Sequence, residues 1–119
     1  MSDTPDVSVV CSTYNRATRL PSLLTALDQQ TFDHDRFEVV IVDNGSGDDT
    51  SAALDRLEQE LGLRIRRVTL QKNRGASGGR NAGWRAAAAP LIAFTDDDCV
   101  ADPGWLETGV QLMGDPGTS

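Results

Sequence analysis

Short apolar runs and helically spaced leucines alternate along the first third of the chain. Val7 to Cys11 is an apolar run rich in β-branched residues, and it predicts a buried strand. Phe37 to Val42 predicts a second buried strand, which ends at Asp43. Between these strands, four leucines have the spacing of one helix face: Leu20, Leu23, Leu24 and Leu27.

A turn and a second helix follow. The segment Asn44-Gly45-Ser46-Gly47 has the composition of a tight turn, and Asp48 to Thr50 suits the start of a helix. Gly62 is expected to end that helix. Its apolar side is formed by Ala53, Leu54, Leu57 and Leu61.

The second half of the chain repeats the alternation. Ile65 to Leu70 predicts a third strand, because its apolar residues nearly alternate with polar ones. Ala76 to Ala89 predicts a helix that Pro90 ends. Leu91 to Phe94 predicts a fourth strand, which leads directly into an acidic triplet, and Pro103 is expected to begin a last helix.

This order of strands and helices predicts an α/β fold with a mostly parallel sheet and flanking helices. Ligands in such folds bind beyond the carboxyl ends of the strands. Three polar segments fall there: Ser12 to Arg16 after the first strand, Asp43 after the second, and Asp96 to Asp98 after the fourth. We therefore expect these loops to converge on one site. At 119 residues the chain is a single domain, and residues 113–119 are expected to form a frayed tail.

Composition limits the class of partner. A formal charge of -7 argues against nucleic-acid binding, which requires a basic face. Seven of the eleven basic residues nevertheless fall within one stretch, which indicates either a solvated face or a local pocket for a small anion. They are Arg64, Arg66, Arg67, Lys72, Arg74, Arg80 and Arg85.

The cysteines and the amino terminus predict a cytoplasmic protein. Cys11 and Cys99 are isolated in apolar stretches, as reduced core cysteines usually are. The amino-terminal residues are acidic and lack the pattern of a signal peptide. No apolar stretch is long enough to span a membrane. His34 lies in a charged turn, and no chemical role is expected for it.

The acidic triplet is the main candidate for metal chemistry. Adjacent carboxylates repel one another unless a cation compensates. In an extended backbone, Asp96 and Asp98 project to one side and Asp97 to the other. Hard oxygen ligands of this kind suit Mg²⁺ or Mn²⁺ shared with a phosphate. The alternative interpretation is a solvated acidic turn that caps a helix.

Three further features could contact a ligand. Asp43 could accept hydrogen bonds from a base or a ribose, and the Tyr14 ring could lie against a nucleobase. The glycine-rich segment Asn73 to Gly83 could present backbone N–H groups and Arg80 to a diphosphate. The alternatives are a capping role for Asp43, a covering role for Tyr14, and a flexible loop with small residues for close helix packing.

Other nucleotide-binding and phosphate-binding motifs fit poorly. The segment Gly45 to Thr50 imitates GxGxxG but has Thr50 in place of the third glycine, and no P-loop motif occurs. Asp96 to Val100 resembles the nucleophile motif of haloacid-dehalogenase-like phosphatases, in which Asp96 would be the nucleophile. That family requires a lysine downstream of the motif, and no lysine follows Val100.

Taken together, the motifs resemble the amino-terminal half of glycosyltransferase family 2. Four segments carry this resemblance in order: Val7 to Arg16, Val42 to Thr50, Asn73 to Gly83, and Phe94 to Asp98. The resemblance covers about residues 7–112. It implies a Rossmann-like nucleotide-diphospho-sugar transferase fold of the A type, truncated because only the amino-terminal half is matched.

The resemblance also implies roles for individual residues. Asp96 and Asp98 match the DxD motif that holds a divalent metal, with Asp98 the better candidate for direct coordination. Asp97 is expected nearer the ribose, and Arg80 near the base or the diphosphate. The expected donor-binding set is Ser12, Thr13, Tyr14, Arg16, Asp43, Asn73, Gly75, Arg80, Asn81 and Asp97. Asn44 and Cys99 depart from the family pattern, where acidic residues are frequent.

Inverting enzymes of this family take their carboxylate base from a later segment, which this chain lacks. We therefore expect the chain to bind a UDP-, GDP- or dTDP-linked sugar with Mn²⁺ or Mg²⁺ and to transfer sugar weakly or not at all alone. The alternative is a nucleotide-binding module without catalysis. Surface left uncovered by the missing half predicts self-association, in the simplest case as a homodimer.

Overall fold

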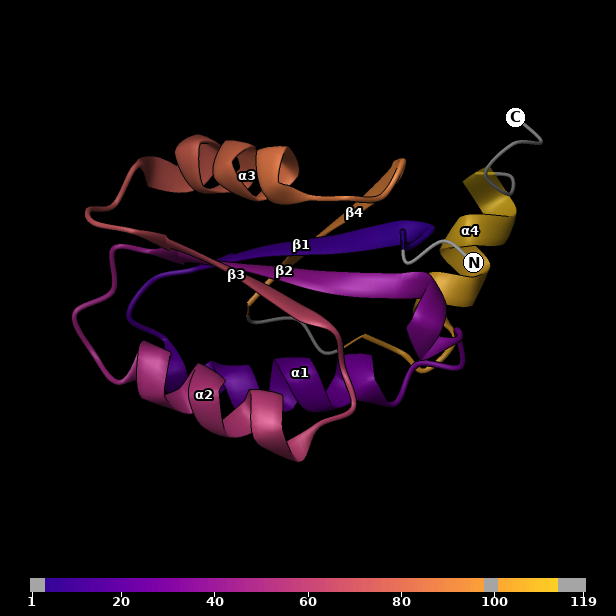
Figure 1. Cartoon of the computed structure of the whole chain (residues 1–119), viewed down its shortest axis with the longest axis horizontal. Helices are drawn as coiled ribbons and strands as arrows, with labels where there is room; N and C mark the ends of the chain where they lie inside the picture. The colour runs from indigo at the N-terminus through magenta and orange to yellow at the C-terminus, as the bar shows by residue number, and fades with distance from the viewer. Residues whose placement is uncertain (1–3, 98–100, 114–119) are drawn as a thin grey trace.

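The computed structural model describes residues 4–97 and 101–113 (Figure 1). The strands are β1 (Val7–Thr13), β2 (Phe37–Asn44), β3 (Ile65–Leu70) and β4 (Leu91–Asp96). The α-helices are α1 (Leu20–Asp28), α2 (Thr50–Glu60), α3 (Gly75–Ala86) and α4 (Trp105–Met113). Two short 3-10 helices, η1 (Ala17–Arg19) and η2 (His34–Arg36), precede α1 and β2. Every strand and α-helix expected from the sequence is present, in the expected order.

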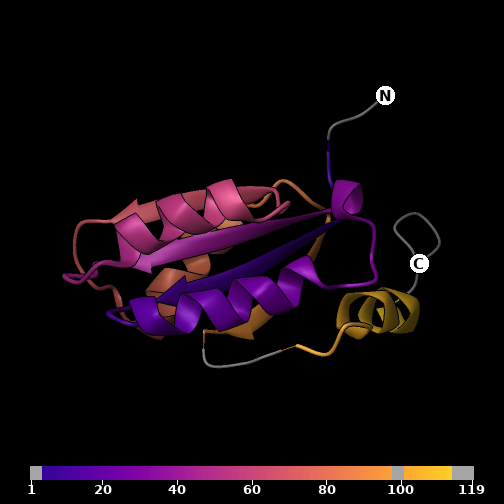
Figure 2. The same cartoon turned by 90° about the horizontal axis from the view of Figure 1, so that it is seen from below.

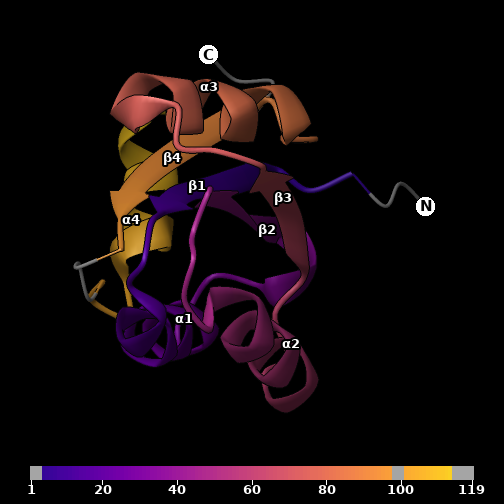
Figure 3. The same cartoon turned by 90° about the vertical axis from the view of Figure 1, so that its left-hand side faces the viewer.

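The four strands form one parallel sheet in the order β3-β2-β1-β4. Helices α1 and α2 cover one face of the sheet and α3 covers the other, as Figures 1 and 3 show. The chain moves outward from β1 to β2 and β3, and then crosses to the other side of β1 to form β4. A site at the carboxyl edge is expected where the strand order reverses in this way. The predicted α/β class and parallel sheet are confirmed.

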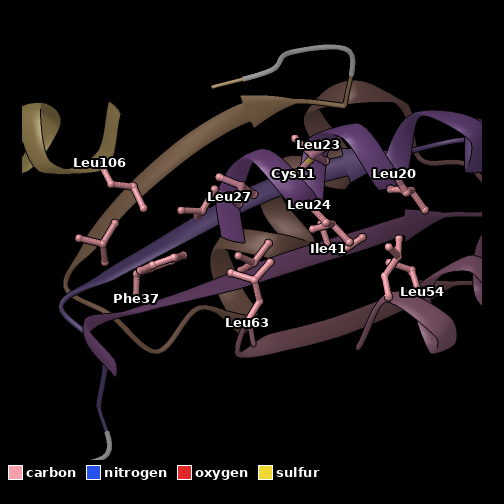
Figure 4. Packing of buried hydrophobic residues seen from close by; sticks show 14 of the residues in the cluster. Cys11, Leu20, Leu23, Leu24, Leu27, Phe37, Ile41, Leu54, Leu63 and Leu106 are labelled. Atoms are coloured by element: carbon pink, nitrogen blue, oxygen red, sulfur yellow. The ribbon is translucent and has the colours of Figure 1, made fainter. Parts of the chain in front are cut away.

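The main hydrophobic core lies between the sheet and helices α1 and α2 (Figure 4). Alternate residues of β1 and β2 face it, among them Val9, Cys11 and Ile41. All four leucines of the predicted face of α1 are buried in it. Burial of one large apolar side chain contributes about 1.5–3 kcal/mol, so this layer fixes the face of the sheet on which α1 and α2 lie. Cys11 is a buried free thiol, as predicted, whereas Cys99 lies outside the described residues.

Helix α4 lies beyond the amino ends of the strands, away from the carboxyl edge (Figure 2). The side chain of Gln30 fixes it by donating to the Asp102 carbonyl and accepting from the Leu106 backbone N–H. The helix begins at Trp105, two residues after the predicted start at Pro103, because the intervening residues form a turn. The predicted frayed tail lies largely outside the described residues, which end at residue 113.

On the opposite face, α3 approaches the sheet through two glycines one helical turn apart. A Cβ atom at Gly83 would lie 2.4 Å from Val10 Cγ1 and 3.0 Å from Val42 Cγ2. A Cβ atom at Gly79 would lie 2.3 Å from Ser12 Oγ. Only glycine permits so close an approach of the helix to the sheet. Packing therefore explains part of the glycine-rich sequence of α3.

The predicted end of α3 at Ala89 is wrong, because the helix ends at Ala86. The backbone N–H of Ala88 donates to Glu38 Oε2 at 2.8 Å, and that of Ala89 donates to Ser8 Oγ at 3.1 Å. These bonds to the sheet replace the bonds that would continue the helix. Pro90 also disfavours helical backbone at the preceding residue. The alanine run therefore leaves the helix early despite its high helix propensity.

Glu38 is a buried carboxylate in the middle of this network. Its side chain is 1% exposed and accepts hydrogen bonds from Ser8 Oγ at 2.6 Å and from Arg66 Nε at 3.2 Å, in addition to Ala88. Burial raises the pKa of Glu38, but the hydrogen bonds from Ala88, Ser8 and Arg66, together with the Arg66 charge, outweigh burial and lower it. The ionised carboxylate thus ties the segment between α3 and β4 to the sheet.

We predict that Glu38→Gln lowers the free energy of unfolding at about pH 7 by about 1–2 kcal/mol, since glutamine keeps one acceptor oxygen and loses the charge. A carboxyl group whose pKa is lower in the folded state stabilises the protein above its unfolded pKa. That stabilisation disappears as the pH falls through the folded pKa. The difference between wild type and variant should therefore shrink between about pH 7 and about pH 3.5 in urea unfolding experiments.

The exposed Glu60, whose side chain pairs only weakly with Arg56, provides the control. Glu60→Gln should change the free energy of unfolding by less than about 0.5 kcal/mol at either pH. A Glu38→Gln penalty of the same size at both pH values would contradict the proposed role of the ionised carboxylate.

Candidate donor-binding site

A cavity of about 470 Å³ opens at the carboxyl ends of the strands, where the sequence predicted a site. Three strand ends and the start of α3 contribute to it. Its lining residues are Ser12, Thr13, Tyr14, Arg16, Asn44, Asn73, Gly75, Ala76, Arg80, Phe94, Thr95, Asp96 and Asp97. Nine of the twelve predicted site residues are in this list. Asp43 and Asn81 are not, and Asp98 lies outside the described residues.

The pairing of the strands decides which side chains reach the cavity. Strand β1 lies between β2 and β4, with Ser12 opposite Val42 on one side and Asp96 on the other. Strands β1, β2 and β4 each continue two residues beyond their predicted ends, so the last polar residues belong to the pleated sheet. Side chains alternate between faces there. The residues that follow this alternation on the α3 side and line the cavity are Ser12, Asn44 and Asp96.

Asp43 points to the other face of β2, which packs against α1 and α2. The residue is 7% exposed, and its Oδ1 accepts a hydrogen bond of 3.0 Å from the Ser46 backbone N–H. The Asp43 carboxylate thus stabilises the turn that follows β2. Sequence reasoning placed the end of the strand too early and so gave Asp43 the position that Asn44 occupies.

Asn44 fixes the segment that leads into α3. Its Oδ1 accepts from the Arg74 backbone N–H at 2.9 Å, and its Nδ2 donates to the Gly75 carbonyl at 3.0 Å. Gly45 has φ +81°, and a Cβ atom there would lie 2.4 Å from the backbone nitrogen of Asn73. An aspartate at position 44 could not donate to Gly75. The departure from the family pattern therefore has a structural role that the sequence did not reveal.

The loops after β1 and β2 are joined by side chains. Asn15, with φ +52°, accepts from the Gly47 backbone N–H at 2.7 Å, while its own backbone N–H donates to Ser46 Oγ at 2.9 Å. Asp48 accepts from the backbone N–H groups of Ala17 and Thr50. The Thr50 hydroxyl is the main cause of a lowered pKa for Asp48. Tyr14 is thereby presented at the cavity with an exposed ring.

Asp96 and Asp97 have different environments. The Asp97 side chain is buried, and it accepts from Thr13 Oγ1 at 2.9 Å and from Arg16 Nη1 at 3.0 Å. Asp96 is exposed, lines the cavity, and makes no hydrogen bond or ion pair with residues 4–97 or 101–113. One carboxylate is thus occupied by the protein and its neighbour is available to a ligand.

The basic stretch divides into two groups. Arg66 and Arg67 on β3 pair with carboxylates, Arg66 with Glu38 and Arg67 with Asp55 and Glu58. Arg80 forms no ion pair within the part of the chain that the structure describes, and its side chain lines the cavity. Asn81 follows Arg80 on α3 but lines two other hollows beside this helix and not the cavity. The prediction of a local anion pocket within a largely solvated basic stretch thus rests on Arg80.

The donor atoms present fit a hard divalent cation. Asp96 offers carboxylate oxygens that no group within residues 4–97 and 101–113 occupies, and oxygen is the ligand that Mg²⁺ and Mn²⁺ prefer. No group of three or more potential metal-ligating side chains occurs within residues 4–97 and 101–113. Mg²⁺ sites commonly use one or two carboxylates and complete the shell with water and substrate phosphates. A site built around Asp96 would be of that kind.

Some lining residues were not predicted. Ala76, Phe94 and Thr95 contribute to the cavity wall in addition to Asn44. Phe94 is 49% exposed at the edge strand β4, next to the half-exposed Trp84 of α3. The apolar pattern of β4 suggested burial for Phe94, whereas alternation directs its side chain to the same face as Asp96.

Comparison with known proteins establishes the family. The model of glycosyl transferase family 2 matches residues 8–119, so the chain belongs to this family. This membership confirms the resemblance deduced from the four motifs. It also decides against the phosphatase alternative, in which Asp96 would be a nucleophile.

Curated relatives are similar over nearly the whole chain. Glycosyltransferase AglE of Haloferax volcanii is 33% identical over 98% of this chain. Validoxylamine A glucosyltransferase of Streptomyces hygroscopicus subsp. jinggangensis is 40% identical over 97% of it. The chain spans 38% and 27% of the lengths of these two relatives.

Solved structures share the fold. The mannosyltransferase PcManGT from Pyrobaculum calidifontis, in complex with GDP-Man and Mn²⁺, superposes with a TM-score of 0.88 and 30% identity, covering 95% of this chain and 33% of that protein. TarS residues 1–349 of S. aureus, in complex with UDP-GlcNAc, gives a TM-score of 0.82 and 28% identity. The fold is therefore the Rossmann-like fold of A-type glycosyltransferases. Among the helices of the described ranges, none combines the length and hydrophobicity that a membrane crossing requires.

Proposed function

We propose that the chain binds a nucleotide-diphosphate sugar in this cavity and supplies the donor- and metal-binding half of a glycosyltransferase. The observation that carries the proposal is Asp96, an exposed carboxylate without a partner in the described ranges, in one cavity with Arg16 and Arg80. Oxygen ligands next to guanidinium groups suit a diphosphate that shares a divalent cation. The complexes of two structural neighbours, with GDP-Man and Mn²⁺ and with UDP-GlcNAc, support it.

The lining residues suggest where each part of the donor would bind. Ser12, Thr13 and Tyr14 would contact the nucleobase, with the exposed Tyr14 ring available for stacking. Arg80 and the backbone at the start of α3 would bind the diphosphate. Asp96, together with Asp98, would hold the cation. When bound, a divalent cation of this kind neutralises charge on a departing nucleoside diphosphate.

The described carboxylates in the cavity leave no convincing candidate for the base that activates an acceptor. Asp97 is occupied by Thr13 and Arg16, and Asp96 is assigned to the cation. We therefore propose that the 119-residue chain transfers sugar weakly or not at all alone. A nucleotide-binding module without catalysis is the alternative, and transfer to an acceptor in a longer relative carrying this segment would distinguish the two. Homodimer formation and a cytoplasmic location stay predictions from the sequence.

Calorimetric titration of UDP, GDP and dTDP into the purified chain, first with Mn²⁺ and then with chelator, tests the donor site. We expect one nucleotide to bind with Mn²⁺ and its binding to disappear with chelator, because the diphosphate and the protein would share the cation. Nucleotide binding that is unchanged by chelator would contradict the proposal that a divalent cation takes part in binding. The absence of binding by all three nucleotides in either condition would contradict the donor site itself.

A further inference from the structure

Asp97 differs from Asp96 in having both carboxylate oxygens engaged by the protein. Oδ2 accepts from the Thr13 hydroxyl at 2.9 Å, and Oδ1 accepts from Arg16 Nη1 at 3.0 Å. The residue is 7% exposed. Its two partners lie 84 and 81 residues earlier in the chain, at the end of β1 and in the loop that follows. A carboxylate bonded to the protein through both oxygens and 7% exposed presents little surface to a ribose, although the sequence suggested that contact.

Arg16 is the exposed member of this network. Its side chain is 53% exposed and lines the cavity, and Asp97 is its only side-chain partner within the described ranges. A long arginine side chain without a partner occupies many rotamers. A buried aspartate bonded to one guanidinium nitrogen limits those rotamers and leaves the other nitrogens free to donate to a ligand.

The Arg16–Asp97 pair also changes the charge at the cavity. A diphosphate that approaches Asp96 and Asp97 would meet two adjacent negative charges. Arg16 compensates one of them, and Asp97 holds that compensating cation at the cavity wall. Planar guanidinium groups bind phosphate oxygens in a bidentate manner, so a preorganised Arg16 is suited to a diphosphate.

We infer that Asp97 is a positioning residue, which acts on the donor through Arg16 by holding its guanidinium group at the cavity wall, where it would bind the diphosphate. This inference rests on the proposed function. It replaces the expected contact between Asp97 and the ribose. Thr13 completes the arrangement by filling the second carboxylate oxygen, which keeps Asp97 fixed at the junction of β1 and β4.

A double-mutant cycle with Asp97→Asn, Arg16→Gln and the double variant tests this inference. UDP, GDP and dTDP would be titrated with Mn²⁺ by calorimetry, and thermal melting would verify that each variant is folded. We expect Asp97→Asn to weaken nucleotide binding about tenfold when Arg16 is present. An effect of this size lies within the range of coupling energies between contacting residues. In the Arg16→Gln background, the same change should have less than about a twofold effect.

The Mn²⁺ concentration for half-maximal nucleotide binding provides a readout that a loss of stability would not mimic. We expect Asp97→Asn to leave this concentration unchanged within about twofold, and Arg16→Lys to lose less affinity than Arg16→Gln because lysine keeps the charge. An equal loss of affinity from Asp97→Asn in both backgrounds, or a large shift in the Mn²⁺ dependence, would mean that Asp97 contacts the donor or the metal directly. Either result would overturn the inference and leave the proposed function standing. A wild type that binds none of UDP, GDP and dTDP would overturn both the inference and the proposed function.

Discussion

Replacement of Asp96 by asparagine is expected to abolish the Mn²⁺-dependent binding of nucleotide while leaving the fold intact. Asparagine has nearly the same shape, so the change removes charge and one carboxylate oxygen. We expect affinity to fall by at least about 100-fold, since the loss of even an outer-shell partner of a metal ligand costs 10–100-fold. Titration of UDP and GDP across a range of Mn²⁺ concentrations would measure the loss.

The structure indicates why the fold should tolerate this change. Asp96 is exposed and has no hydrogen-bond or ion-pair partner in the parts of the chain that the structure describes. The free energy of unfolding without metal should therefore change by less than about 0.5 kcal/mol. Asp35, exposed in η2 at the opposite end of the sheet, provides the matched control, and Asp35→Asn should bind nucleotide as the wild type does. Unchanged metal-dependent binding by Asp96→Asn would contradict the assignment of Asp96 to the cation.

The order of elements was predictable because each apolar segment has a clear period. The leucines of α1 follow helical spacing, and the β-branched runs of β1 and β2 are too short and too uniformly apolar for surface helices. Together with the rule that parallel strands place ligands at their carboxyl ends, these patterns located the cavity. Burial of the leucines and the convergence of three strand ends confirm this part of the prediction.

The exchange of Asp43 and Asn44 has a different cause. Local patterns place the ends of elements only to within a few residues, and in a strand a shift of one residue moves a side chain to the other face. Asp43 carries a carboxylate and directly follows the apolar run, so the sequence favours it over Asn44 as a ligand-binding residue. The pairing of Asn44 with Leu70 of β3 keeps the strand pleated through this position and directs its amide towards α3.

Contacts between distant segments explain the remaining differences. The run Ala86 to Ala89 is locally a good helix, yet Glu38 and Ser8, at least 50 residues away, bind its N–H groups. The bonds from Thr13 and Arg16 to Asp97 likewise join positions more than 80 residues apart. A periodic pattern carries no information about such pairs. The sequence therefore located the triplet but could not distinguish Asp96, which has no partner among the described residues, from Asp97, which is bonded to Thr13 and Arg16.

Substitution of Gly83 by alanine is expected to lower the free energy of unfolding by about 3 kcal/mol, the upper part of the range for overpacked cores. Its Cβ atom would lie 2.4 Å from Val10 and 3.0 Å from Val42, both of which are fully buried. Valine side chains are stiff at χ1, so neither can rotate away easily. Urea or thermal unfolding would measure the loss.

A glycine-to-alanine substitution in α4 provides the control, because its expected effect on the free energy of unfolding has the opposite sign. Gly109 is also a helical residue, but a Cβ atom there would meet no atom of the described residues within 4 Å, apart from its chain neighbours and the backbone of its own helix. Since alanine favours a helix over glycine by about 1 kcal/mol, Gly109→Ala should stabilise the protein by up to that amount. Both variants gain helix propensity, so the difference between them isolates the contact of α3 with the sheet.

Gly83→Ala should also weaken nucleotide binding, because the helix that it would displace, α3, contributes residues to the cavity. Outward movement of α3 would draw Gly75 away from Asn44 and shift Arg80 relative to Asp96. We therefore expect Gly83→Ala, at temperatures where it remains folded, to bind nucleotide more weakly than Gly109→Ala does. A Gly83→Ala variant as stable as the wild type would mean that α3 can separate from β1 and β2 without cost.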